Sequence, residues 1–226
     1  MEWTCSKLGC AKIDMLKNNM ELYSYVIPRD YGFAPNPFGG ICSLATCKPQ
    51  IRKHASIGDW ISGFGGANTS ITRKMVFLMQ VDDICTFDEY WDNPNFSYKK
   101  PIFEGKYQDC YGDNIYHHTK DGHWIQEDSH HSYENGVVNM NNLMHDTGTD
   151  RVLLSENFWY FGDSAIDLPL ELSRVIAYGR GYRKFDQEIC TEIVRWVAEQ
   201  YEPGQHGLPY SWTRRRGFIR YKGERT

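Results

Sequence analysis

The sequence predicts an α+β fold that is mainly β, with short helices and one amphipathic helix near the C-terminal end. Aromatic residues make up 15 % of the 226 residues, and aromatic side chains favour strands. Short runs of β-branched and aromatic residues alternate with turns rich in proline and glycine, a pattern typical of β-rich domains. Only residues 187–201 have the spacing of a long amphipathic helix. The chain length fits a single domain.

The first part of the chain contains two predicted strands around a rigid loop. Residues 22–27 are rich in aromatic and branched side chains and are followed by a proline, which predicts a strand that ends there. The prolines and glycines of residues 29–40 exclude a helix and predict a shaped loop. Residues 42–54 are predicted as a short helix that is broken near Pro49. Residues 57–61 form a predicted tight turn that enters the second strand.

The middle of the chain has a strong strand signal followed by a long polar stretch. Residues 74–81 are an apolar run that predicts a strand, and Thr86 is the predicted N-cap of a short helix. Residues 92–150 are polar and loop-rich, which is unusually long for a compact domain unless function resides there. Residues 151–155 and 157–161 then predict a pair of strands.

The last predicted element is the helix at residues 187–201, which Asp186 caps and Pro203 ends. Its apolar face contains Ile189, Ile193 and Val197. The order of strand, basic loop, Gly-Asp-Trp turn, strand and returning strand resembles that of open barrels of the PUA, ASCH and EVE kind. Such domains hold a nucleotide or base at the barrel mouth. The expected architecture is therefore a PUA/EVE-like open barrel closed by the C-terminal helix.

Composition narrows the possible partners. The formal net charge is −4, so no global basic field attracts the chain to nucleic acid or membrane. The longest apolar run, residues 75–79, is far shorter than the roughly 20 residues that a bilayer requires. The N-terminus has no basic region followed by an apolar one, as a secretory signal would. Seven cysteines, an odd number, suggest a reducing compartment, and the expected location is the cytoplasm, without membrane contact.

The predicted organisation is one domain between two extensions. Residues 1–19 are expected to be an N-terminal extension, residues 20–205 a single domain and residues 206–226 a basic C-terminal tail. In the tail, arginines and lysine alternate with Trp212, Phe218 and Tyr221, which suits phosphate contacts and base stacking. A solvated tail explains the same composition.

The cysteines allow a zinc site but predict no nucleophile. Cys5 and Cys10 have the same C-x4-C spacing as Cys42 and Cys47, and four thiolates could hold a structural zinc. The alternative is a set of reduced, partly buried thiols that act as small hydrophobic groups. There is no G-x-S-x-G motif, and no cysteine has an evidently electropositive sequence context, so a nucleophilic Cys or Ser is not expected.

Histidine and aspartate gather in the long polar stretch. Six of the eight histidines lie between positions 117 and 145, with carboxylates interleaved. These are the groups of general acid–base catalysis and of metal ligation, although the spacing matches no known metal signature. Three interpretations stay open: a divalent metal site, a metal-free active or binding site, and ordinary surface histidines. The candidate catalytic residues are Asp113, His117, Asp128, His130, His131, His145, Asp146 and Asp150.

A set of motifs in fixed order resembles a known family. The motifs are DYGFAPNPF (30–38), TCKPQIR (46–52), GDWI (58–61), FDEYW (87–91), GDNIYH (112–117), DSHHS (128–132) and HDTGTDRVL (145–153). Together they resemble the second of the nucleotide modification associated domain families of bacteria and phages, over residues 20–201. The resemblance implies a part in DNA base hypermodification. It implies no established reaction or catalytic residue.

Two functions follow as hypotheses. The first is a protein that modifies a nucleotide or a base in DNA, with the His/Asp cluster as acid–base groups or ligands of a divalent metal. The alternative is a non-catalytic reader of modified bases or small nucleotides. A scaffold that positions other base-modification enzymes is a third possibility. The candidate nucleotide-binding residues are Arg29, Phe33, Asn36, Phe38, Lys48, Arg52, Trp60, Asn114, Tyr116 and Arg151. Among them Arg29, Lys48 and Arg52 would hold phosphate, and Phe33, Phe38 or Trp60 would stack on the base.

Overall fold

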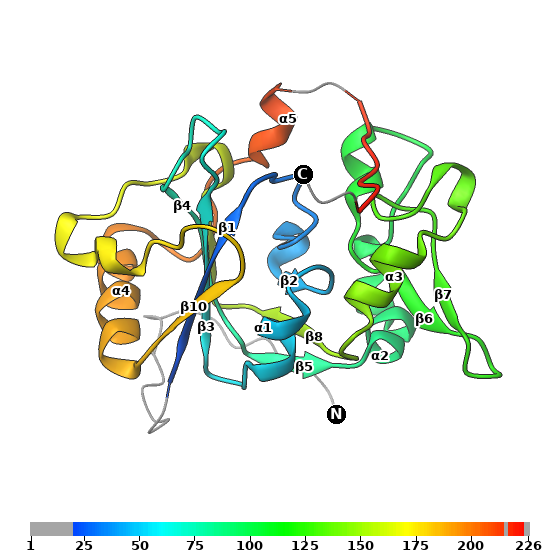
Figure 1. Ribbon diagram of the computed structural model, residues 1–226, viewed down its shortest axis with the longest axis horizontal. Coiled ribbons are helices and arrows are strands. Elements are labelled where there is room, and N and C mark those ends of the chain that lie inside the picture. The colour runs from blue at the N-terminus through cyan, green and yellow to red at the C-terminus, as the bar shows by residue number, and fades with distance from the viewer. Residues whose placement is uncertain (1–19, 215–216, 224–226) are drawn as a thin grey trace.

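The computed structural model describes residues 20–214 and 217–223, and its elements lie in successive layers (Figure 1). A six-stranded mixed sheet with the order β10-β1-β3-β4-β9-β11 lies next to helix α4 in Figure 1. Its strands are β10 (Tyr182–Phe185), β1 (Leu22–Ile27), β3 (Trp60–Gly65), β4 (Met75–Gln80), β9 (Phe158–Tyr160) and β11 (Gly204–Gln205). β1 runs parallel to β3, and β9 runs parallel to β11, whereas the other neighbours are antiparallel.

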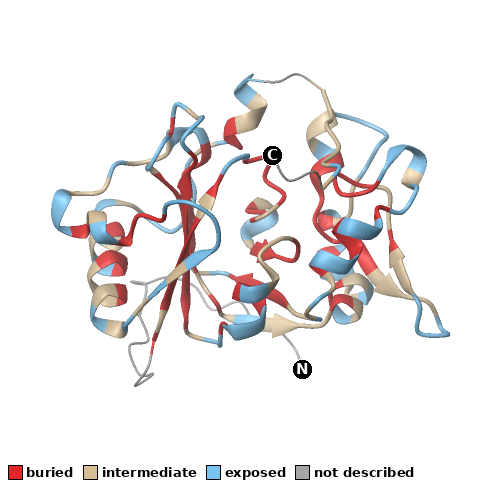
Figure 2. Cartoon of the chain, in the orientation of Figure 1, coloured by how far each residue is buried: buried red, intermediate tan, exposed pale blue. Residues whose placement is uncertain are grey.

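Alternating side chains make the sheet hydrophobic on both faces. Tyr23, Tyr25 and Ile27 of β1 enter one core, whereas Leu22 enters the core on the opposite face. This is the period of two that a strand imposes on its side chains. Figure 2 shows the consequence, a sheet that is buried along most of its length.

Helix α4 (Gln187–Gln200) covers one face of this sheet. The Asp186 side chain accepts a hydrogen bond from the Ile189 backbone N–H at 3.2 Å, which caps the helix as the sequence predicts. Ile193 and Val197 pack into a core that contains Trp60 and Trp159, whose ring centroids lie 6.0 Å apart.

A small sheet covers the other face. It consists of β2 (Cys42–Leu44), β8 (Val152–Ser155) and β5 (Asp83–Cys85), in the order β2-β8-β5, with helix α1 (Pro49–His54) beside it. The predicted helix at residues 42–54 is therefore wrong for its first part, which is strand β2. The two predicted strands at 151–155 and 157–161 exist, but they belong to different sheets and do not pair with each other.

The predicted long loop, residues 92–150, contains most of the outer layer. This layer holds α2 (Phe87–Asp92), the hairpin of β6 (Tyr116–His118) and β7 (Trp124–Gln126), and α3 (Met140–Asp146) (Figure 1). Thr86 and Glu89 form a capping box at the start of α2, as its predicted N-cap suggests. The sequence signal of the hairpin and of α3 is weak because these elements are short and polar.

The remaining elements are short. Helix α5 (Tyr210–Arg214) lies near the C-terminal end. Short 3₁₀ helices connect the larger elements, at Phe38–Gly40, Pro94–Lys99, Tyr107–Tyr111, Glu134–Gly136, Gly162–Ser164 and Leu170–Val175. The sheets are open, and the described residues form no closed barrel. In the described part of the chain no helix is long and apolar enough to cross a membrane.

The chain ends bear on two sequence expectations. The expected extension, residues 1–19, lies outside the described residues, and so do Cys5 and Cys10 of the predicted thiol set. Cys42 is fully buried in β2. The described part of the predicted tail packs against the outer layer, since Trp212 and Phe218 contact its hydrophobic core.

Candidate active site

The Asp146 carboxylate is the centre of a buried polar cluster. Asp146 is the last residue of α3, whose first turn is capped by the Asn139 side chain. Its Oδ1 accepts a hydrogen bond from the Cys47 backbone N–H at 2.8 Å. Its Oδ2 accepts hydrogen bonds from His131 Nδ1 at 2.7 Å and from the Tyr116 hydroxyl at 2.9 Å. Burial alone would raise the pKa of Asp146, but His131 and Arg52 lower it below its ordinary value.

His131 lies between this carboxylate and a thiol. Its Nδ1 faces Asp146, and its Nε2 lies 3.8 Å from Cys47 Sγ. Burial disfavours a charged imidazole, but Asp146 and Cys47 outweigh it and raise the pKa of His131 to about 10. Near neutral pH the ring is therefore a cation that is held between two groups able to carry negative charge.

The backbone at Cys47 is strained in a way that serves this geometry. Cys47 and Lys48 have φ values of 56° and 40°, in the left-handed region that side chains other than glycine rarely adopt. The two residues turn the chain from β2 into α1, which begins with Pro49. The turn presents the half-buried Cys47 side chain to His131 and its N–H to Asp146.

Arg52 connects the backbone segments that carry Cys47 and Asp146. Its side chain is fully buried, and its guanidinium donates to the carbonyl oxygens of Cys47, Asp146, Thr149 and Arg151. One cation thus ties the Cys47 turn to the segment that carries Asp146. This role uses the donors of Arg52 inside the protein and leaves none exposed for a phosphate.

Two cations and a ring border the thiol and imidazole. Lys48 is half-buried, with its ammonium 4.6 Å from the centroid of the Tyr25 ring. The exposed Arg29 lies 5.4 Å above the ring of Tyr221, which itself contacts His131 at 5.5 Å between centroids. Positive charge and a flat face therefore lie beside the cluster.

The arrangement has two chemical capacities. The ligand atoms of Cys47, His131 and Asp146 lie within 4.8 Å of one another, which is compatible with a metal ion. Both Asp146 oxygens also accept hydrogen bonds, which fix the orientation of the carboxylate and still leave a lone pair on Oδ1. The same line of groups also suits proton transfer, because the carboxylate orients the imidazole and the imidazole faces the thiol.

Several sequence candidates meet here. His131, Asp146 and Tyr116 are in direct contact, and Arg52 and Lys48 flank them. His130 and Phe33 line the cluster, since the Phe33 ring lies 4.6 Å from His131 and 5.0 Å from His130. Both are buried, and burial lowers the pKa of His130 to about 3.

A second group of candidates forms a separate buried network. Asp113 accepts hydrogen bonds from Ser43 at 2.6 Å and from Tyr90 at 2.9 Å. Lys99 donates to Asn36 at 2.8 Å, and burial lowers the pKa of this lysine to about 8. Asn114 donates to the Tyr90 carbonyl oxygen at 2.8 Å. These contacts join the small sheet to the outer layer.

The other candidates lie away from the cluster or support the fold. Trp60 is completely buried against Trp159, so its ring cannot stack on a base. Arg151 donates to the carbonyl oxygens of Arg52 and Ala55, and Asp150 accepts from the Phe87 N–H.

Three further catalytic candidates contact other groups. His117 stacks on Trp91 and pairs with Glu127 at 2.8 Å. Asp128 pairs with Arg220, and His145 is exposed on α3.

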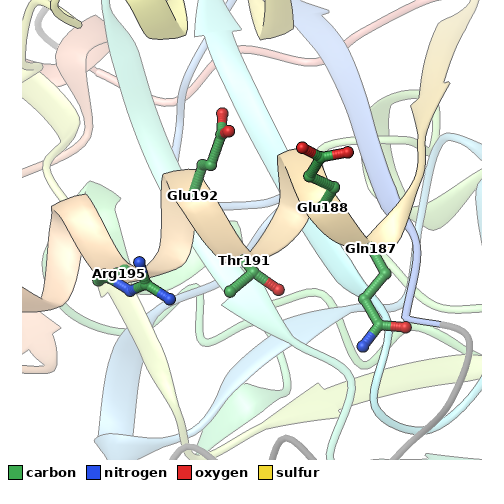
Figure 3. Close-up of a pocket in the computed structure, with 5 residues that line it drawn as sticks. All are labelled: Gln187, Glu188, Thr191, Glu192 and Arg195. Carbon is green, nitrogen blue, oxygen red and sulfur yellow. The ribbon is translucent and has the colours of Figure 1, made fainter.

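Two surface hollows lie outside the cluster. One, of about 430 Å³, includes Phe38, which stacks on Trp212 at 5.4 Å. Figure 3 shows the other, of about 470 Å³, lined by five side chains of α4 alone. Both signs of charge occur there, and Glu192 pairs with Arg174, so this hollow belongs to the solvated surface.

The sequence indicated Cys47 only as a possible zinc ligand and did not predict its contact with His131. The available signal was a thiol two residues before a proline that starts a helix, where the chain must turn. It was not decisive, because the groups that act on the sulfur come from segments 84 and 99 residues away.

Comparison with known proteins gives one match. The family model described as nucleotide modification associated domain 2 matches residues 19–216. Curated proteins and solved structures gave no match.

Proposed function

The chain belongs to the nucleotide modification associated domain 2 family, and from this premise we propose that it modifies a nucleotide or a base in DNA at the Cys47–His131–Asp146 cluster. The observation that carries the proposal is the line of carboxylate, imidazole and thiol beside a cationic face. His131 would move a proton to and from the reacting atoms, and Asp146 would keep its ring oriented.

The border of the cluster supports a nucleotide as the ligand. The Arg29 guanidinium and the Lys48 ammonium would contact phosphate, and the Tyr221 ring would lie against the base. Because the net charge is −4, electrostatic attraction for a polyanion has to come from a local cationic face such as this one. Other base-modification enzymes are proposed partners that would supply or use the modified nucleotide.

Ligand binding is the first test. Deoxynucleotides and single- and double-stranded DNA would be screened for a rise in unfolding temperature, with and without divalent metal. A ligand at about 100 times its Kd stabilises by about 2.7 kcal/mol, or roughly 5–10 °C for this size. The matched control is Lys120→Ala, an exposed lysine in the β6–β7 turn. Arg29→Ala and Lys48→Met should weaken binding, whereas Lys120→Ala should not.

Product analysis separates catalysis from recognition. Incubated nucleotide should change mass with the wild-type chain and stay unchanged with His131→Gln. Binding that is normal in both, with no product in either, would support a non-catalytic reader of the PUA or EVE kind. No stabilisation by any ligand would contradict the proposal.

A further inference from the structure

We propose that Cys47 is a covalent nucleophile that carries an acyl group as a thioester, which makes the cluster an acyl-transfer site. The acyl donor would be an ester, thioester or amide, and the acceptor would be an amine or hydroxyl. That the acceptor belongs to a nucleotide rests on the proposed function, but the chemistry at the sulfur does not.

The geometry is that of an activated thiol. Cys47 Sγ lies 3.8 Å from His131 Nε2, and the opposite nitrogen of the same ring lies 2.7 Å from Asp146. An imidazole placed so can share one proton with the thiol, and the carboxylate favours the form in which the ring holds that proton. The Tyr116 hydroxyl and the Cys47 N–H fix the carboxylate, so the three groups are held in line before any substrate arrives.

Cys47 also differs from a comparable thiol in the same chain. Cys85 is half-buried as well, but burial and the nearby Asp83 and Glu89 raise the pKa of its thiol to about 12. Cys47 instead lies with its sulfur 3.8 Å from the His131 imidazole. The fold thus provides two half-buried cysteines, and Cys47 has an imidazole beside its sulfur.

The position of His131 favours acyl transfer over metal binding. His131 Nε2 faces the Cys47 sulfur at 3.8 Å, whereas Asp146 accepts three hydrogen bonds from protein donors and so serves to orient the ring. In acyl transfer the group that holds the thiol proton must deliver it to the leaving group, which departs from the acyl carbon that the sulfur attacks. An imidazole beside the sulfur is placed for both steps.

The proposed reaction balances without an oxidant or reductant. In the first half, the Cys47 sulfur bonds to the acyl carbon while the bond from that carbon to the leaving group breaks. The proton that Cys47 and His131 share passes from His131 to the leaving group. In the second half, the acceptor bonds to the acyl carbon and gives its proton to His131. The carbon–sulfur bond then breaks, and the proton returns to the thiol.

The test uses the full chain and p-nitrophenyl acetate as the acyl donor, with no nucleotide. At pH 6 a free thiol of pKa about 8.5 is roughly 0.3 % thiolate, so unactivated cysteines acylate slowly. Peptide mapping should find acetyl on Cys47 at least about tenfold faster than on Cys85, with a burst of one nitrophenolate per chain. Equal rates at the two cysteines in the folded wild type would overturn the proposal.

Variants test the role of the imidazole. His131→Asn should lower the acetylation rate of Cys47 by about tenfold or more and leave that of Cys85 unchanged. Circular dichroism would check the fold of the variant. If the variant does not fold, the ratio of the acetylation rates of Cys47 and Cys85 in the wild type decides the test. Acetylation that occurs only after a chelator is added would indicate a bound metal and would also overturn the proposal.

The two proposals fail separately. If Cys47 is acetylated and no nucleotide binds, the proposed function is refuted and the proposal that Cys47 is a nucleophile is supported. Nucleotide binding and turnover with an inert Cys47 would keep the function and remove the nucleophile.

Discussion

Replacing Asp146 with asparagine is the sharpest perturbation of this protein. The change keeps the shape of the side chain, and the amide oxygen can still accept from the Cys47 N–H. However, its NH₂ group would face His131 Nδ1–H and the Tyr116 hydroxyl, and His131 would lose its counter-charge. Breaking a buried ion pair on one side costs about 3–5 kcal/mol. For this chain length that corresponds to a fall in Tm of about 6–20 °C.

Asp88→Asn is the matched control. Asp88 also pairs with a histidine, His118, at 2.9 Å, but the two side chains are 44 % and 24 % exposed, against 0 % and 3 % for Asp146 and His131. An exposed pair contributes about 1 kcal/mol or less, so the control should lose less than about 4 °C. Thermal unfolding followed by circular dichroism measures both. Similar losses of Tm in the two variants would refute the argument from burial.

NMR titration of His131 should also show a pKa near 10 in the wild type and a lower pKa in Asp146→Asn.

Three further outcomes follow from the contacts. Arg52→Met removes the donor to four carbonyl oxygens and should lower the free energy of unfolding, measured by urea denaturation, by at least about 3 kcal/mol. The same change at the exposed Lys53 should alter it by no more than about 0.5 kcal/mol. A loss below about 1 kcal/mol for Arg52→Met would contradict the role of Arg52. Because the folded pKa of His131 is raised, its pairing should stabilise fully below pH 6.5 and progressively less up to about pH 10; the lowered pKa of Asp146 should cost stability as pH falls below 3.8. The difference in unfolding free energy between wild type and Asp146→Asn isolates this dependence, and a difference that is constant with pH would refute it. Trp60→Ala should lower the free energy of unfolding by about 3–5 kcal/mol and leave nucleotide affinity unchanged. Weaker nucleotide binding by the folded variant would show that Trp60 contributes to the binding site.

The C-terminal segment, residues 217–223, packs beside the cluster. The Tyr221 N–H donates to the His130 carbonyl oxygen at 2.6 Å, and Asn142 donates to the Tyr221 carbonyl oxygen at 2.7 Å. Arg220 also pairs with Asp128. The arginine that composition suggested for phosphate contact is therefore used inside the protein. Its ring neighbour Tyr221 is the part of the tail that reaches the candidate site.

The sequence by itself determined the elements whose signals are local. Strand β1 coincides with its predicted bounds, and Asp186 caps α4 as expected, because alternation, helical period and capping each depend on residues a few positions apart. The order of motifs likewise identified the family. The concentration of histidine and aspartate between residues 113 and 150 indicated the segment from which two groups of the candidate site, His131 and Asp146, come.

Tertiary structure decided which of these polar groups lie together in the candidate site. Trp60 and Arg52 resemble binding residues in sequence, but packing removes the first into the core and uses the second to bind backbone carbonyls. Cys47 lies two residues before Pro49, a local signal that does not identify its partner, and it becomes notable only beside His131, 84 residues away. Burial, the direction of a side chain and the charge around it arise from such distant contacts, and no local pattern encodes them.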